Sequence, residues 1–226
     1  MRKQLGIAAL MAGLFAAGSA QALLIDNFST DQSVAVTGAA PASSSGNVAG
    51  GGMISADRDI TINKTTGGTG GANGTYVDVQ GGLLGVANGP VTDSNVHVLW
   101  DGFAVTDLTA GGATGFYLAL PTAIDNTLKI DFFINGMTSS ISKTFLNGAS
   151  GPDFFFSFSD FSAPGVFTSV TSIEMVLYST GPAWDAQVDL LETRDRPPTK
   201  VPEPGTLGLL GLGLLGGVAM RRRKSA

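Results

Sequence analysis

Apolar and polar residues alternate along most of the chain, and the pattern is clearest at residues 127–135. There Leu128, Ile130, Phe132 and Ile134 share one parity, while polar residues fill most of the other positions. A period of two residues is typical of a strand with one buried face, because successive side chains point to opposite sides. We therefore expect a strand here, with these four side chains in the core.

The same period predicts ten further strands, which fall at residues 23–28, 33–37, 59–64, 75–80, 95–100, 115–120, 141–145, 154–158, 172–178 and 183–191. Many are separated by tight-turn residues, as at Asn135-Gly136. Residues 39–52 and 65–74 are rich in small residues and are predicted to be loops. The expected fold is all-β, with two antiparallel sheets packed face to face in a jelly-roll-like sandwich.

Composition agrees with this expectation, because the 226 residues include 32 Gly and only 14% charged residues. Residues 23–200 contain 17 Asp and Glu against 7 Lys and Arg, which gives this part a formal charge of −10. A surface of that sign repels a phosphate backbone, so we expect no nucleic-acid partner. The absence of Cys removes disulfides and thiolate chemistry.

The N-terminus has the three parts of a secretory signal peptide. Basic Arg2 and Lys3 precede an apolar stretch at residues 5–18, and then Ala20 and Ala22 fit a small-x-small cleavage site. A membrane anchor is the alternative, but about 14 apolar residues reach only about 21 Å, against a hydrocarbon core of about 30 Å. We therefore expect signal peptidase to cut after Ala22.

The C-terminus combines three features in a fixed order: Pro202, Glu203 and Pro204, then an uncharged apolar run at residues 206–220, then Arg221, Arg222, Arg223 and Lys224. The prolines oppose a helix, so the segment around them is predicted to be extended. The apolar run is a predicted membrane helix, and the basic cluster keeps its far end in the cytoplasm. The rest of the chain then lies outside the cytoplasm, in agreement with the signal peptide.

This tail resembles the PEP-CTERM sorting signal of Gram-negative, exopolysaccharide-producing bacteria, over residues 201–226. The resemblance implies that a membrane-embedded exosortase cuts the chain near the Pro-Glu-Pro motif. The protein would be anchored transiently in the inner membrane and then reach the cell surface or the extracellular matrix. An ordinary C-terminal anchor is the alternative, although such an anchor does not need the motif.

The sequence thus divides into five predicted parts: a signal peptide (1–22), a β-sandwich domain (23–193), a Pro-rich linker with the motif (194–205), an apolar sorting helix (206–220) and a basic cytoplasmic tail (221–226).

No catalytic constellation is evident in the predicted domain. His97 is the only histidine, and alternation places it on the polar face of its strand. One histidine cannot build a three-histidine zinc site, and nothing marks a nucleophile beside it. We expect a non-enzymatic domain without a cofactor.

Aromatic residues give one lead toward ligand binding. Trp100, Trp184, Tyr76 and Tyr117 could each stack on the apolar face of a sugar ring. Trp100 shares the parity of the apolar residues in its strand, which predicts that it lies in the core. Trp184 lies near the start of the last predicted strand and is the predicted surface aromatic, hence the candidate glycan contact.

Carboxylates give a second lead, at Asp26, Asp57, Asp59, Asp185 and Asp189. Calcium takes six to eight oxygen ligands, and an acidic exported domain meets this ion routinely. No EF-hand loop or RTX-type repeat is present, and solvated carboxylates at turns are the alternative. These five residues are candidates for a calcium site.

Two functions remain open for the exported domain. The leading hypothesis is a non-enzymatic surface or extracellular-matrix protein associated with exopolysaccharide or biofilm, because the sorting tail and the acidic body occur without catalytic residues. The alternative is a carbohydrate-binding module of the jelly-roll type, which the predicted sandwich and Trp184 favour.

Overall fold

The computed structural model describes residues 22–195, except for the side chains of residues 152 and 153. Within these residues the regular structure consists of thirteen strands and four short 3-10 turns, without an α-helix. All strand pairings are antiparallel. The predicted signal peptide before Ala22, the predicted linker beyond Asp195, and the predicted sorting helix and basic tail lie outside the described residues.

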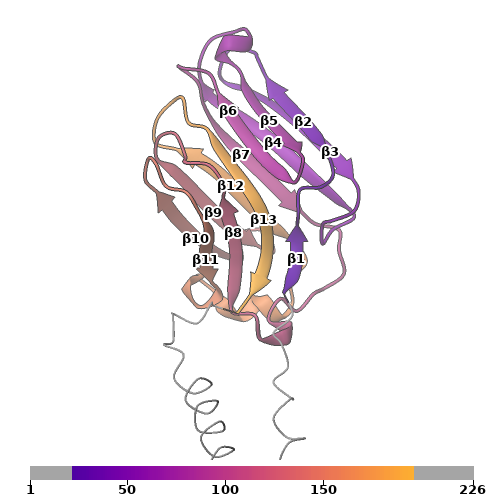
Figure 1. Cartoon of the computed structure of the whole chain (residues 1–226). Helices are drawn as coiled ribbons and strands as arrows, with labels where there is room; N and C mark the ends of the chain where they lie inside the picture. Colours follow the sequence, from indigo (N-terminus) through magenta and orange to yellow (C-terminus); the bar gives the residue numbers. More distant parts are fainter. Residues whose placement is uncertain (1–21, 196–226) are drawn as a thin grey trace, which may run out of the picture. The chain divides into compact units, whose positions relative to one another are not determined.

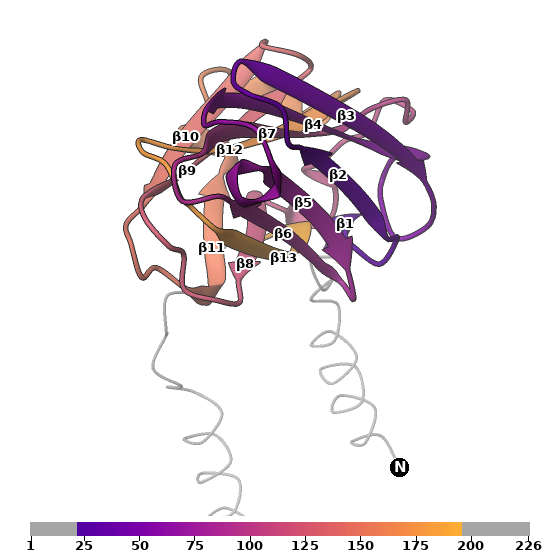
Figure 2. The ribbon, with the colours of Figure 1, turned by 90° about the horizontal axis from the view of Figure 1, so that it is seen from above.

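The strands form two sheets that face each other, as Figures 1 and 2 show. The seven-stranded sheet has the order β11 (Gly151–Ser157), β8 (Gly115–Leu120), β13 (Ala186–Arg194), β6 (Leu83–Asn88), β5 (Thr75–Gln80) and β2 (Gln32–Val36), with β1 (Leu23–Asp26) paired to β13. The six-stranded sheet has the order β10 (Ser139–Phe145), β9 (Leu128–Ile134), β12 (Ile173–Ser179), β7 (Asp93–Trp100), β4 (Asp57–Thr66) and β3 (Ala42–Ala49). The predicted two-sheet antiparallel sandwich is confirmed.

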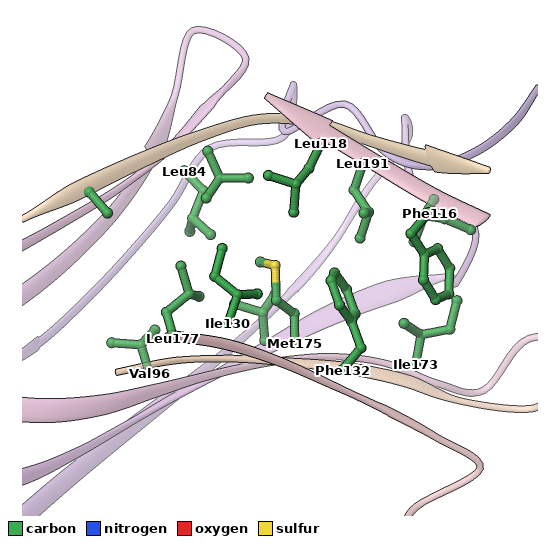
Figure 3. Close-up of a cluster of buried hydrophobic side chains, with 14 of the residues drawn as sticks. Leu84, Val96, Phe116, Leu118, Ile130, Phe132, Ile173, Met175, Leu177 and Leu191 are labelled. Carbon is green, nitrogen blue, oxygen red and sulfur yellow. The ribbon is translucent and has the colours of Figure 1, made fainter. Parts of the chain in front are cut away.

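The core lies between the inner faces of the sheets. Figure 3 shows Leu84, Leu118 and Leu191 of the seven-stranded sheet pointing toward Ile130, Met175 and Leu177 of the six-stranded sheet. Leu128, Ile130, Phe132 and Ile134 are all buried, so the faces predicted for this strand are confirmed. Phe132 stacks on Phe116 of the opposite sheet, with the ring centroids 5.0 Å apart.

Two strands were not predicted. Residues 39–52 were expected to be a loop, but β3 runs through them and pairs with β4 along its whole length. At Gly46 a side chain has little room because β2 packs against the strand: a Cβ there would lie 2.8 Å from Cγ2 of Val34. The second, β6, joins β5 through Gly81-Gly82, where both residues have positive φ, a two-residue turn that suits a twisted hairpin.

A buried ion pair connects the two sheets at one end of the core. Asp26 of β1 and Arg58 of β4 are both fully buried, and Oδ2 of Asp26 accepts a 2.9 Å bond from Nη1 of Arg58. The same oxygen accepts a 2.8 Å bond from Nε1 of Trp100, and Oδ1 accepts one from the amide of Phe28. The guanidinium also donates to Gln32 and to a backbone carbonyl of the adjoining loop. Every charge here has a partner, as burial requires.

Replacing Phe132 by Ala should lower the free energy of unfolding by about 3–5 kcal/mol, because a large buried ring is lost and a cavity remains. Its neighbour Phe133 lies half-buried on the outer face of the same strand and is the matched control. Urea denaturation of the body should show a clearly smaller loss for Phe133→Ala. Equal losses would mean that the two faces of β9 are assigned wrongly.

Replacing Asp26 by Asn should cost about 3–5 kcal/mol, because the Arg58 charge stays buried without its counter-charge. Asp59→Asn is the control: Asp59 is partly exposed and accepts a bond from Asn47, so its loss should stay within about 0.5 kcal/mol. Chemical denaturation measures both variants. A loss for Asp26→Asn no larger than that of the control would contradict the role given to the buried pair.

Candidate functional site

The outer face of the seven-stranded sheet contains a groove of about 430 Å³. Its walls and floor come from β5, β6, β13 and the loop that follows β8. The lining includes Tyr76, Asp78, Gly85, Ala87, Asp185 and Gln187.

The groove exists because small residues occupy the middle of the sheet. The register sets Asp78 of β5 beside Gly85 of β6, and Gly85 beside Gln187 of β13. Ala87 likewise lies beside Tyr76. Because Gly85 has no side chain, a hollow forms between an aspartate and a glutamine that point outward from the neighbouring strands.

The Tyr76 ring is held in place at the groove. Its hydroxyl donates a 3.2 Å bond to the carbonyl of Gly71, in the short turn before β5. The ring also packs so closely on Gly74 that a Cβ there would lie 2.8 Å from Cε2. A ring fixed in this way loses little conformational freedom when a ligand stacks on it.

Polar groups give the groove its chemistry. One carboxylate oxygen of Asp185 accepts a 2.8 Å bond from the backbone amide of Asn88, which fixes the side chain on an otherwise exposed residue. Asp78 is also exposed, and Gln187 is half-buried. Together they offer acceptors and donors at the rim of an open hollow, which suits a ligand that carries many hydroxyl groups.

The five calcium candidates do not come together in the sandwich. Asp26 is committed to the buried ion pair, and Asp57 and Asp59 lie side by side on β4, where Nδ2 of Asn47 donates to both. Asp185 and Asp189 belong to the other sheet. Among the described residues no three His, Cys, Asp or Glu side chains are grouped closely enough to hold a metal ion.

The prediction that Trp184 is a surface aromatic is wrong. Trp184 is fully buried, and its Nε1 donates a 3.1 Å bond to Asp93. It precedes β13, which begins at Ala186, and the neighbouring Ala183 has a φ of 59°, so strand alternation does not apply here. Burial raises the pKa of Asp93, and the bonds from Ser94 and Trp184 oppose that rise.

Two of the remaining three aromatic candidates, Trp100 and Tyr117, are also enclosed. Trp100 lies in the core, as predicted. Tyr117 is only 6% exposed, and the guanidinium of Arg194 lies over its ring at 4.3 Å. Tyr76 is therefore the one of the four that lines the groove. Gly85 and Gln187 were not predicted as site residues, because only the pairing of β6 with its neighbours brings them beside Tyr76 and Asp78.

His97 lies far from this groove in the fold, on the outer face of the six-stranded sheet. Its Nδ1 is 2.7 Å from Oε1 of Glu174 on the adjacent strand, and both side chains are about one-third exposed, at 31% and 28%. The register places Val176 and Thr61 on either side of it. No hydrogen bond joins His97 to a Ser or Thr hydroxyl within residues 22–195.

A second hollow of about 380 Å³ lies on that same outer face, between β9 and β10. Asp131 lines it and accepts a 3.0 Å bond from the hydroxyl of Tyr178. Burial raises the pKa of Tyr178, and the bond to Asp131 raises it further. Three of its lining residues are serines, and no Tyr or Trp among the described residues lines it.

Comparison with known proteins identifies the tail. The family model of the PEP-CTERM protein-sorting motif matches residues 200–224, which confirms the resemblance found in the sequence. The chain therefore carries a PEP-CTERM sorting signal, which implies export and processing by an exosortase. The family model matches the tail alone, and the β-sandwich is not part of the match. No curated protein matches the chain.

Several solved structures resemble the sandwich distantly. One is a family 11 carbohydrate-binding module from Clostridium thermocellum, in complex with a β-1,3-1,4-mixed-linked tetrasaccharide; it is 14% identical over 77% of this chain and 96% of that chain, with a TM-score of 0.40. Another is a carbohydrate-binding module of family 29, 6% identical over 73% of this chain and 88% of that chain, with a TM-score of 0.36. Within the described residues, no helix has the length and apolar character needed to cross a membrane.

Proposed function

We propose that the exported body is a non-enzymatic surface or extracellular-matrix protein that associates with exopolysaccharide through the groove on its seven-stranded sheet. The observation that carries this proposal is the hollow over Gly85, which has a fixed tyrosine at one strand and polar side chains on either side.

The groove has the chemistry that a polysaccharide chain requires. The apolar face of a sugar ring packs on an aromatic ring, and Tyr76 is held ready for that contact by Gly71 and Gly74. Hydroxyl groups of the sugar can then bond to Asp78 and Gln187. The hollow is open rather than enclosed, so it accommodates the interior of a long chain, and its volume lies within the usual range of about 300–1,000 Å³ for ligand sites.

Several contacts support a binding role rather than catalysis. His97, the sole histidine, pairs with Glu174 on the opposite sheet from the groove. A nucleophile needs a base within hydrogen-bond distance and a third group that orients that base. Among the described groove residues, the side-chain hydrogen bonds of Tyr76 and Asp185 go to backbone groups, so neither side chain is paired there with a histidine base.

A dedicated carbohydrate-binding module is the second candidate, and the same groove favours it. The two functions differ in ligand range. A dedicated module binds defined oligosaccharides, whereas a matrix protein needs affinity only for the polymer that the producing cell exports.

Replacing Gly85 by Val should abolish glycan binding and leave the fold intact. A Cβ at Gly85 would meet only the backbone oxygen of Asp78, at an ordinary 3.6 Å, and valine favours a strand. The added side chain fills the floor of the groove. Binding of residues 23–200 to the cell's own exopolysaccharide, measured by affinity electrophoresis and calorimetry, should be lost in Gly85→Val and reduced at least roughly tenfold in Tyr76→Ala.

The control for these variants is His97→Ala, which alters the opposite sheet and should bind like the wild type. Incubation with the polymer should release no reducing ends. Binding that survives in Gly85→Val would move the site away from this groove, and no wild-type binding at millimolar sugar would leave a purely structural role.

Replacing Pro202, Glu203 and Pro204 together by Ala should trap uncut protein in the membrane. The motif is where an exosortase acts, and the apolar run and basic cluster that follow it would then remain attached. Intact mass spectrometry of surface-located wild-type protein should show a product that begins at Leu23 and lacks residues 206–226. A surface species that still contains those residues would mean that the tail is a permanent anchor, and His97→Ala should be sorted normally.

A further inference from the structure

The inner face of β4 carries a buried cation at each end. Arg58 and Lys64 flank Ile60 and Ile62, and all four side chains are buried. Arg58 has Asp26 as its counter-charge. Lys64 is only 2% exposed, yet none of the ion pairs among residues 22–195 involves it.

The Lys64 ammonium is instead bonded to three backbone carbonyls. Nζ donates to the oxygens of Gly38 at 2.7 Å and Gly68 at 2.6 Å, and also to the oxygen of Asn73. An ammonium has three donors, so the three acceptors satisfy it completely. The charge interacts with oriented carbonyl dipoles, which is how proteins coordinate free cations as well.

These carbonyls belong to two loops that the ammonium joins. Gly38 lies in the connection between β2 and β3, whereas Gly68 and Asn73 lie in the connection between β4 and β5. Only two backbone bonds link the loops directly, Ala40 to Gly67 and Gly70 to Thr37. Lys64 adds three bonds to these two, one to the first loop and two to the second, so its ammonium joins the loops.

The second loop also supports the groove. Gly71, which accepts the bond from the Tyr76 hydroxyl, and Gly74, which contacts the ring, lie on either side of Asn73. The position of Tyr76 thus depends on a loop that the ammonium holds.

We propose that Lys64 is a built-in structural cation: its ammonium fills a three-carbonyl cage suited to a free monovalent cation, and the caged loop positions Tyr76. The cage contains only neutral carbonyls, which matches a single positive charge, whereas calcium sites use carboxylates. Lys64 is a positioning residue for the groove. The role of Lys64 in positioning Tyr76 for a glycan rests on the proposed function, whereas the cage does not.

The cage can be tested by chemical rescue. Lys64→Ala removes the atoms from Cγ to Nζ, and n-propylammonium has their size and charge. The variant should melt roughly 5 °C or more below the wild type. n-Propylammonium at about 100 mM should restore at least half of that loss, because a ligand that binds only the folded state raises its stability. n-Propanol, which is similar in size but neutral, should restore little.

Lys129→Ala is the matched control. Lys129 is half-buried, and its ammonium lies 5.6 Å from the Tyr178 ring centroid, so the amine should not change the melting temperature of this variant. Rescue of Lys64→Ala by propanol as large as that by the amine would overturn the proposal, because filling of apolar volume would then explain it. Rescue of both lysine variants alike would overturn it too.

A second measurement starts from the wild-type body. Nitrogen-detected NMR of lysine side chains should show a Lys64 ammonium whose protons exchange slowly with water, and a folded Lys64→Arg or Lys64→Met variant should lack that signal. If no lysine ammonium is protected, the cage does not exist. Neither readout involves a glycan, so the proposed glycan site can be disproved without disproving the cage. If a folded Lys64→Met variant binds glycan as the wild type does, only the proposed link between Lys64 and Tyr76 is disproved.

Discussion

The buried pair of Asp26 and Arg58 is the contact on which the arrangement of the sandwich depends most. Asp26 comes from the seven-stranded sheet, whereas Arg58 and Trp100 come from the six-stranded sheet. Both Arg58 and Trp100 donate a hydrogen bond to the same carboxylate oxygen of Asp26. Apolar packing between sheets has no direction, so it tolerates small shifts of one sheet over the other. A buried charge pair does not, because any shift leaves a charge without its partner.

The pair also makes the first strand necessary. β1 consists of four residues; it contributes Ile25 to the core, delivers Asp26 and pairs with β13, the last strand. β13 lies inside the seven-stranded sheet, between β8 and β6. The first and last strands of the domain are thus paired with each other, so both ends of the domain contribute to one sheet.

The groove follows from a different kind of constraint. The sheet that carries it has the usual inner face of apolar residues, but its outer face has small residues where neighbouring strands meet, above all Gly85. Nothing in the fold requires glycine there, since its φ is ordinary and a Cβ would find room. By contrast, Gly46 is required, because any side chain would strike Val34. The glycine at position 85 therefore leaves a hollow that the proposed glycan would fill.

The sequence by itself determined the inner faces of the strands and the fold class. Leu128, Ile130, Phe132 and Ile134 are buried as alternation predicts, because a sheet with one buried face imposes a period of two. It also determined the sorting signal, since a membrane enzyme reads that motif as a local stretch of chain. Only the tertiary structure decided the rest. Small-residue β3 becomes a strand because β4 pairs with it, and Trp184 is buried because an irregular segment turns it inward. Asp26, Lys64 and the groove residues acquire their roles from partners far away in the chain, and no local pattern encodes such contacts.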